Sequence, residues 1–307
     1  MRAAPALADL DGDASLDVVV GDEHGKLWAL AGTDGHALWT LATGENDYNN
    51  HGFVAAAAIV DIDEDGKDDV VAGARDGLLR GIRGFDGREF WQVKDGSGIH
   101  ASPSVIDLDG DGRKEILAAW SYSSVGILDA RTGKQLAGQS LSLDGGGIEG
   151  LFGSPVPLPG GGGAEGFIVQ PGAWWDADDG VTLATPTTRA FKSVEGRTTA
   201  SAVVIDLDAD GYPEAITVTE SGKVIALNGK GQRMELATVA KKSEATPLLA
   251  DVDGDGTIEL LVASGDGNLT CWSTGAKQKP LVSRFRGDSP RNTGELAVRM
   301  PFTTARR

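Results

Sequence analysis

A short acidic pattern recurs five times along this chain and constrains its fold more than any other feature. In each copy, carboxylates stand at positions 1, 3, 5 and 9, position 2 is apolar, and apolar runs lie on both sides. The clearest copy reads Asp-Leu-Asp-Gly-Asp-Gly-Arg-Lys-Glu, from Asp107 to Glu115. The carboxylates of the five copies are Asp9, Asp11, Asp13 and Asp17; Asp61, Asp63, Asp65 and Asp69; Asp107, Asp109, Asp111 and Glu115; Asp206, Asp208, Asp210 and Glu214; and Asp251, Asp253, Asp255 and Glu259.

A loop that carries an oxygen on every second residue can surround a hard cation. Ca²⁺ takes about six to eight oxygen ligands at about 2.3–2.6 Å. Position 6 is Gly in four copies, which permits a positive φ, and Ala14 in the first copy. The backbone carbonyl of position 7 is the expected further ligand, from Ser15, Lys67, Arg113, Tyr212 and Thr257. The sequence therefore predicts about five structural Ca²⁺ sites. They are not EF-hands, because the flanking runs indicate strands and the final acid stands at position 9 rather than 12.

The spacing of the pattern predicts a repeat architecture. The first aspartates stand at 9, 61, 107, 206 and 251, so the intervals are 52, 46, 99 and 45 residues. The long interval contains a degenerate copy: residues 153–158 resemble residues 101–106, and the Gly-rich loop that follows retains only Glu165. We expect no metal in that copy. Each repeat contains four short strand-like runs joined by Gly-bearing turns, and four strands in about 45–50 residues is the period of a β-propeller blade.

The predicted fold is all-β, a six-bladed β-propeller of four-stranded antiparallel blades with Ca²⁺-binding hairpin loops. We expect one domain over residues 1–307, with repeats at about 1–50, 51–98, 99–148, 149–197, 198–242 and 243–287 and a tail at 288–307. Residues 296–300 have strand character. The tail is therefore predicted to pair with a terminal blade and to help hold the ring closed.

The acidic loops and the repeat length resemble FG-GAP (VCBS) repeats over nearly the whole chain. These repeats are the blade unit of the integrin α-subunit propeller and of many secreted bacterial proteins. The resemblance implies that the side chains at positions 1, 3, 5 and 9 bind Ca²⁺ in the hairpin between the first two strands of a blade. It also implies an extracellular adhesion or scaffold module. Residues 26–39 and 129–134 resemble turns of PQQ-type propellers, without implying a quinone site, and residues 285–294 resemble a segment that often closes bacterial members.

Composition supports a folded, acidic protein whose charge lies largely in the predicted metal loops. The formal net charge is −17, and the loops hold twenty of the 45 acidic residues. A nucleic-acid partner is not expected, because the chain lacks a basic footprint. No apolar run approaches the ~18–20 residues of a membrane helix. No signal peptide is visible, but weak Ca²⁺ loops fill where Ca²⁺ is abundant, so a secreted or cell-surface location is expected.

The loops between blades form the predicted ligand face. Loops on a rigid scaffold commonly carry binding residues, and we expect a protein or glycan partner there. The first candidates are Tyr48, Asn50, His51 and His100. Other polar residues of these loops are Asp95, Ser97, Glu149, Glu195, Arg197, Lys241, Lys242 and Glu244.

Other functions remain open at this stage. A polysaccharide-binding or lyase-associated propeller is the alternative, and Trp174 or Trp175 could stack a sugar. His51 and His100 could form a catalytic or transition-metal pair, although no third ligand has motif spacing. An Arg-Gly-Asp tripeptide at residues 286–288 lies within the closing segment, and Cys271 is expected to be a small buried hydrophobe. No nucleophile motif is present, so an enzyme is not the expected function.

Overall fold

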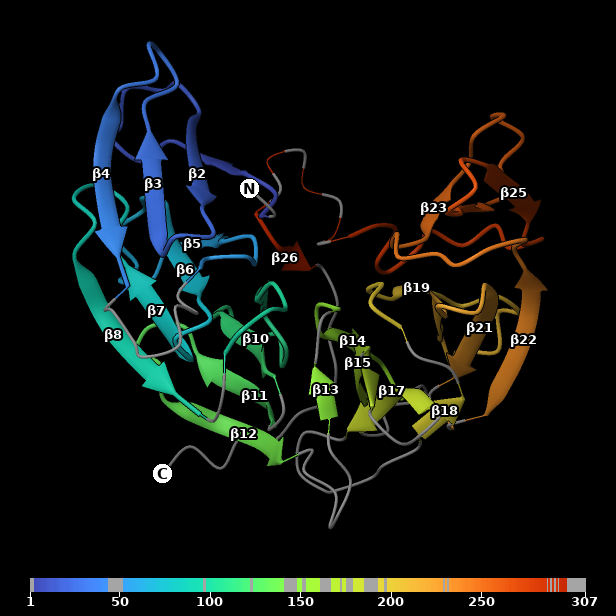
Figure 1. Cartoon of the computed structure of the whole chain (residues 1–307). Coiled ribbons are helices and arrows are strands. Elements are labelled where there is room, and N and C mark those ends of the chain that lie inside the picture. The colour runs from blue at the N-terminus through green and yellow to red at the C-terminus, as the bar shows by residue number, and fades with distance from the viewer. Residues whose placement is uncertain are drawn as a thin grey trace.

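The structure, a computed structural model, consists of short antiparallel β-sheets that follow one another along the chain (Figure 1). It describes residues 3–43, 52–95, 98–121, 124–140, 148–150, 153–160, 167–171, 173–174, 179–184, 193–195, 198–228, 230, 232–285, 287, 289, 291 and 293–296. Within these residues, no helix has the length and hydropathy that crossing a membrane requires. Figure 1 shows the sheets grouped around a common centre, where β26 (Glu295–Leu296) lies.

The sheets correspond to the predicted blades. Blade 1 contains β1 (Ala6–Ala8), β2 (Asp17–Gly21), β3 (Lys26–Leu30) and β4 (Ala37–Ala42). Blade 2 contains β5 (Ala58–Val60), β6 (Asp69–Gly73), β7 (Leu78–Ile82) and β8 (Glu89–Lys94). Blade 3 contains β9 (Ser104–Ile106), β10 (Glu115–Trp120), β11 (Ser124–Asp129) and β12 (Gln135–Ser140).

Blade 4, the degenerate copy, contains β14 (Val156–Leu158), β15 (Phe167–Pro171), β17 (Asp179–Ala184) and β18 (Ser193–Glu195), while β13 (Ile148–Gly150) pairs separately with β16 (Ala173–Trp174). Blade 5 contains β19 (Val203–Ile205), β20 (Glu214–Val218), β21 (Lys223–Asn228) and β22 (Arg233–Thr238). Blade 6 contains β23 (Leu248–Ala250), β24 (Glu259–Ala263) and β25 (Leu269–Ser273).

Buried apolar side chains hold neighbouring blades together. One cluster joins blades 1 and 2, a second joins blades 2 and 3, a third joins blades 3, 4 and 5, and a fourth joins blades 5 and 6. Two tryptophans of outer strands each add a hydrogen bond across these contacts. The indole N–H of Trp39 donates to the Gly84 carbonyl oxygen at 2.6 Å, and that of Trp91 donates to the Ala130 carbonyl oxygen at 3.0 Å.

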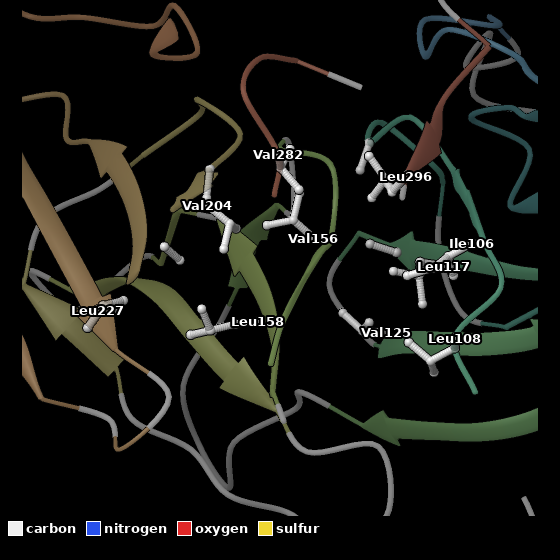
Figure 2. Packing of buried hydrophobic residues seen from close by; sticks show 14 of the residues in the cluster. Ile106, Leu108, Leu117, Val125, Val156, Leu158, Val204, Leu227, Val282 and Leu296 are labelled. Carbon is white, nitrogen blue, oxygen red and sulfur yellow. The ribbon is translucent and has the colours of Figure 1, made fainter. Parts of the chain in front are cut away.

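The C-terminal tail, residues 281–296, runs past the innermost strand of one blade after another. The middle residue of each of five inner strands donates its backbone N–H to a tail carbonyl oxygen at 2.8 or 2.9 Å. The donor–acceptor pairs are Val204–Val282, Leu249–Ser283, Leu7–Arg291, Ile59–Thr293 and Val105–Gly294, in blades 5, 6, 1, 2 and 3. Two residues of the tail, Val282 and Leu296, belong to the buried cluster that joins blades 3, 4 and 5. Figure 2 shows Val282 beside Val156 of blade 4 and Leu296 on the side of Ile106 of blade 3.

The path of the tail corrects two sequence predictions. The predicted strand at residues 296–300 was expected to pair with a terminal blade, but its one described residue, Leu296, lies in β26, which pairs in parallel with β9 of blade 3 through Glu295–Val105 and Leu296–Ile106. Residues 297–300 lie outside the described residues. The contact of the tail with a terminal blade is made earlier, by Arg291 with Leu7 of blade 1. The fourth strand expected in blade 6 does not form from the described residues that follow β25. Pro280 interrupts that segment, and Leu281 and Val282 instead bond to Val204 of blade 5.

Candidate metal centres

Each acidic loop connects the first and second strands of a blade, as the sequence predicted. Position 1 follows the inner strand directly, and position 9 is the first residue of the second strand, as Asp17, Asp69, Glu115, Glu214 and Glu259 show. The apolar residue at position 2 anchors the loop against the next blade: Leu10, Ile62 and Leu108 are fully buried, and Leu207 is half-buried against the cluster that joins blades 5 and 6. The strands therefore hold both ends of each loop in place.

The five loops share a hydrogen-bond pattern that gathers the carboxylates on the inside. The position 6 N–H donates to the position 1 carboxylate at 2.8–3.2 Å in every loop. The position 7 N–H donates to the position 5 carboxylate at 2.6–2.9 Å in every loop. These are the N–H groups of Ser15, Lys67, Arg113, Tyr212 and Thr257, and coordination by the carbonyls of the same residues stays a prediction.

A second feature common to the loops was not predicted. Positions 4 and 6 both adopt positive φ in all five copies, with values between 60° and 90°. Position 6 is Gly in four loops and Ala14 in the first, where φ is 68°. Position 4 is Gly12, Glu64, Gly110, Ala209 and Gly254. Two left-handed residues separated by one curl the backbone around the carboxylates, and the mixed residue types at position 4 hid this from the sequence pattern.

The carboxylate oxygens of each loop converge on one point. In every loop, three carboxylates offer oxygens that all lie within 4.8 Å of one another. The triads are Asp9, Asp11 and Asp13; Asp61, Asp63 and Asp69; Asp107, Asp109 and Glu115; Asp206, Asp208 and Asp210; and Asp251, Asp253 and Asp255. Among the described residues, every cluster of this kind consists of carboxylates alone. Carboxylate oxygens suit Ca²⁺, whereas softer metals are bound by thiolate or imidazole.

Three of these oxygens show that the loops fit a cation. Asp63 Oδ1, Asp107 Oδ1 and Asp206 Oδ1 are buried atoms without a hydrogen-bond partner. A buried acceptor with no donor is costly, so it calls for an ion or a water. All three belong to the converging triads, at position 3 or position 1. The donor set and these oxygens together match a divalent ion bound inside the loop.

The carboxylate at position 9 fastens the loop to the blade. In all five loops it accepts the backbone N–H of position 2 at 2.8–3.0 Å. Burial raises the pKa of Asp69 to about 6 and the pKa values of Glu115 and Glu214 to about 7, and the other carboxylates of each loop add to this, while the position 2 N–H offsets part of it. Negative charge on these three carboxylates is thus unfavourable until a cation compensates it.

The predicted ligand face is only partly described. Tyr48, Asn50 and His51 lie outside the described residues. His100 is half-buried, and its Nδ1 lies 2.6 Å from the hydroxyl oxygen of buried Ser121, so the ring is held against β10 and its following turn. The sugar-stacking hypothesis also cannot be placed, since Trp175 and the side chain of Trp174 are not described. Cys271 is exposed, so the prediction that it is buried is wrong.

Two pockets lie at opposite ends of the blades. A pocket of about 570 Å³ on the predicted ligand face is lined by the loop between blades 5 and 6 and the turn after β24. Its walls include Lys241, Lys242 and Glu244, and Lys242 Nζ lies 2.7 Å from Glu244 Oε1. A pocket of about 560 Å³ lies between the acidic loops of blades 2 and 3. Ion pairs cross its walls, including Arg131 with Glu64 at 3.2 Å and Lys114 with Glu295 at 2.8 Å.

Comparisons with known proteins agree on the fold. A PQQ-type family model, described as outer membrane protein assembly factor BamB, matches residues 4–148, which include the turns that resembled PQQ-type propellers in sequence. The match is not to an FG-GAP model. A comparison with curated proteins found no match.

Similar solved structures extend over most of the chain. BamB from Moraxella catarrhalis is 18% identical and covers 89% of this chain and 85% of its own, but its TM-score of 0.45 is too low to support an argument. BBS1N in complex with ARL6DN is 13% identical, covers 87% of this chain and 78% of its own, and has a TM-score of 0.55. The Dos1 propeller is 12% identical, covers 91% of this chain and 68% of its own, and also scores 0.55. At these identities the likeness concerns the fold alone: the chain folds as a β-propeller.

Proposed function

We propose that this chain is a Ca²⁺-stabilised β-propeller that serves as an extracellular binding or scaffold module of the FG-GAP kind. The observation that carries the proposal is the common geometry of the five acidic loops. Their carboxylates converge, their hydrogen bonds repeat, and buried oxygens in three of them have no partner. The ions are structural rather than catalytic, because each would fasten the first strand of a blade to the second.

Calcium stabilises such a protein by binding the native state alone. One site adds RT ln(1 + [L]/Kd) to the free energy of unfolding, about 2.7 kcal/mol at a hundredfold excess over Kd. Without an ion, the carboxylates of a loop repel one another and favour opening of the hairpin. An extracellular location supplies Ca²⁺ at the concentrations that weak loops of about 10⁻⁴–10⁻³ M need. Mg²⁺ is a poor substitute, because it demands a smaller octahedral shell.

The test is a calorimetric Ca²⁺ titration of chelator-treated protein, with thermal melts alongside. We expect close to five ions per chain and a melting temperature that rises with Ca²⁺ but little with Mg²⁺. D206N/D208N removes two ligands of one loop and should lower the count by one. Asp34→Asn, in the turn between β3 and β4, is the matched control and should leave five. A count of one or none, or a melting temperature that ignores Ca²⁺, would reject the metal sites.

We propose that a protein or glycan partner binds the face formed by the loops between blades. The pocket of about 570 Å³ with Lys241, Lys242 and Glu244 supports this, because it lies on that face. A glycan array and a cell-surface pull-down, each with and without Ca²⁺, would identify the partner class. Loss of the captured ligand in K241A/E244A would support this face, while unchanged capture would place binding elsewhere. Turnover of a captured polysaccharide would favour the lyase alternative.

A further inference from the structure

Blade 6 presents an uncovered apolar sheet face. In blade 5, the face turned towards blade 6 carries Val203, Ile205, Ile216, Val218, Val224 and Ala226, and all six side chains are fully buried against blade 6. The matching positions of blade 6 are Leu248, Ala250, Leu261, Ala263, Leu269 and Cys271, which we call the open face. None of these six is buried. Leu269 is 65% exposed, whereas its counterpart Val224 is 0% exposed.

The metal loop of blade 6 shows the same lack of a neighbour. Its position 2 residue, Val252, is 53% exposed, while Leu10, Ile62 and Leu108 at the same position are buried in the clusters that join their blades to the next ones, and Leu207 is half-buried against the cluster that joins blades 5 and 6. Val252 therefore has the apolar character that contact with a further blade requires, but no such contact in the described structure. It extends the open face to the end of the blade.

Blade 1 has a complementary uncovered face on its other side. Leu7, Val18, Trp28 and Leu30 are only half-buried. The matching residues of blade 2, which are Ile59, Val70, Arg80 and Ile82, are all buried, and three of them pack against blade 1. Among the described residues, no cluster of buried hydrophobics joins blade 6 to blade 1. The seam between these two blades therefore has an apolar wall on each side.

The tail crosses this seam with more chain than it uses elsewhere. It moves from blade 5 to blade 6 between Val282 and Ser283, and from blade 2 to blade 3 between Thr293 and Gly294. From blade 6 to blade 1, however, it runs from Ser283 to Arg291. Between its bonds to blades 6 and 1 the tail thus uses a longer run of chain than between its bonds to blades 5 and 6 or to blades 2 and 3.

We propose that the seam is a docking site for one further four-stranded blade of this repeat type, carried by polypeptide outside residues 1–307. The face it offers to blade 6 resembles that of blade 2, with branched apolar residues on its first two strands. Docking continues the interface that already joins each blade to the next. It buries Leu269, Cys271 and Val252 on one side and Leu7, Val18 and Trp28 on the other.

The first test compares two substitutions in the chain as it exists. Leu269→Asp and Val224→Asp place the same charge at matching positions of blades 6 and 5. We expect Leu269→Asp to leave the melting temperature within about 1 °C of the parent. Val224→Asp should lower it by many degrees, because it buries an unpaired charge. If Leu269→Asp lowered the melting temperature as much as Val224→Asp, the open face would already be covered, and the proposal would be overturned.

The second test supplies a blade and reads its docking at Cys271. A second copy of residues 53–98 is fused ahead of residue 1 through a short flexible linker. Because Cys271 is the single cysteine of the chain, the rate of its reaction with a maleimide reports directly on cover of the open face. We expect at least tenfold slower labelling in the fusion. A control fusion, in which the copy carries the V70D and A72D substitutions, should label as fast as the parent chain.

Two outcomes of the second test would overturn the proposal. Labelling at the parent rate in both fusions would show that a blade of this type does not dock on the open face. Labelling of the parent chain that slows as protein concentration rises would show that the face is covered by a second copy instead. Slower labelling in the intact fusion alone supports the proposal.

Discussion

Val105 and Pro157 occupy the same position in successive blades, but only Val105 donates a hydrogen bond to the tail. Each is the middle residue of its inner strand and stands two residues before position 1 of the loop. The N–H of Val105 donates to the Gly294 carbonyl oxygen at 2.8 Å. Proline has no N–H to offer. Blade 4 is therefore the one blade whose inner strand lacks the donor that the other five present to the tail.

The hydrogen bonds to the tail can be tested one at a time. Leu7→Pro should lower the melting temperature by a few degrees, because it removes the bond to Arg291, worth about 1 kcal/mol. β14 already accommodates proline at this position, so the strand itself should persist. Leu7→Val keeps the N–H and is the matched control. Equal melting temperatures for the two variants would show that the bond contributes nothing.

Replacing the two alanines that have positive φ in the acidic loops by glycine should stabilise the protein. Ala14 and Ala209 hold φ values of 68° and 60°, where a Cβ costs about 1–2 kcal/mol. We expect Ala14→Gly and Ala209→Gly each to raise the melting temperature by a few degrees, in Ca²⁺ and in chelator alike. Ala29→Gly, within a buried strand, should lower it. A lower melting temperature for Ala14→Gly would show that the loop relaxes in solution.

The pH dependence of stability should reverse when Ca²⁺ is removed. The folded-state pKa values of Glu115 and Glu214 are raised to about 7, against 4.5 for an ordinary glutamate. Between these values the folded chain binds more protons than the unfolded chain, so the free energy of unfolding falls as pH rises. In chelator, the melting temperature should therefore be lower at pH 7.5 than at pH 5.5.

Two additions check this interpretation. Ca²⁺ binds the deprotonated carboxylates, so saturating Ca²⁺ should make the protein more stable at pH 7.5 than at pH 5.5. The E115Q/E214Q variant in chelator should show a weaker pH dependence than the parent. A pH profile that is the same for parent and variant would assign the effect to other groups.

The indole hydrogen bonds between blades should contribute to stability beyond their apolar area. Trp39→Phe keeps an aromatic ring but removes the N–H that donates to Gly84 O, and should cost about 1 kcal/mol or more. Trp91→Phe should cost a similar amount. Trp28→Phe is the comparison and should cost less, because the indole N–H of Trp28 donates to half-buried Asp22 within its own blade rather than across a contact between blades. Chemical denaturation gives the three values on one scale.

The sequence predicted the loops well because their chemistry depends on side chains. Carboxylates at fixed spacing placed all five loops between the first and second strands of their blades. The second left-handed residue was missed because Glu64 and Ala209 share no residue type with the glycines at position 4. Backbone geometry that several residue types can adopt is difficult to predict from a single sequence.

The course of the tail could not be predicted for a similar reason. Its bonds to the inner strands use backbone N–H and carbonyl groups, which every residue except proline provides. Pro157 and Pro280 were the available signals: one marks the blade without a donor, and the other ends the expected fourth strand of blade 6. The exposed Leu269 and Val252 fit a core pattern equally well in sequence, since an apolar residue does not reveal whether its neighbour is present.

The tail also sets the order in which this protein can be completed during synthesis. Leu7 is made near the start of the chain, but its hydrogen-bond partner Arg291 is made near the end. Blades can fold one by one as they leave the ribosome, because most of their contacts are local. The inner strands, however, keep unpaired donors until residues 281–296 arrive. A nascent chain stalled before that point should thus remain open and protease-sensitive at its axis, whatever the state of its blades.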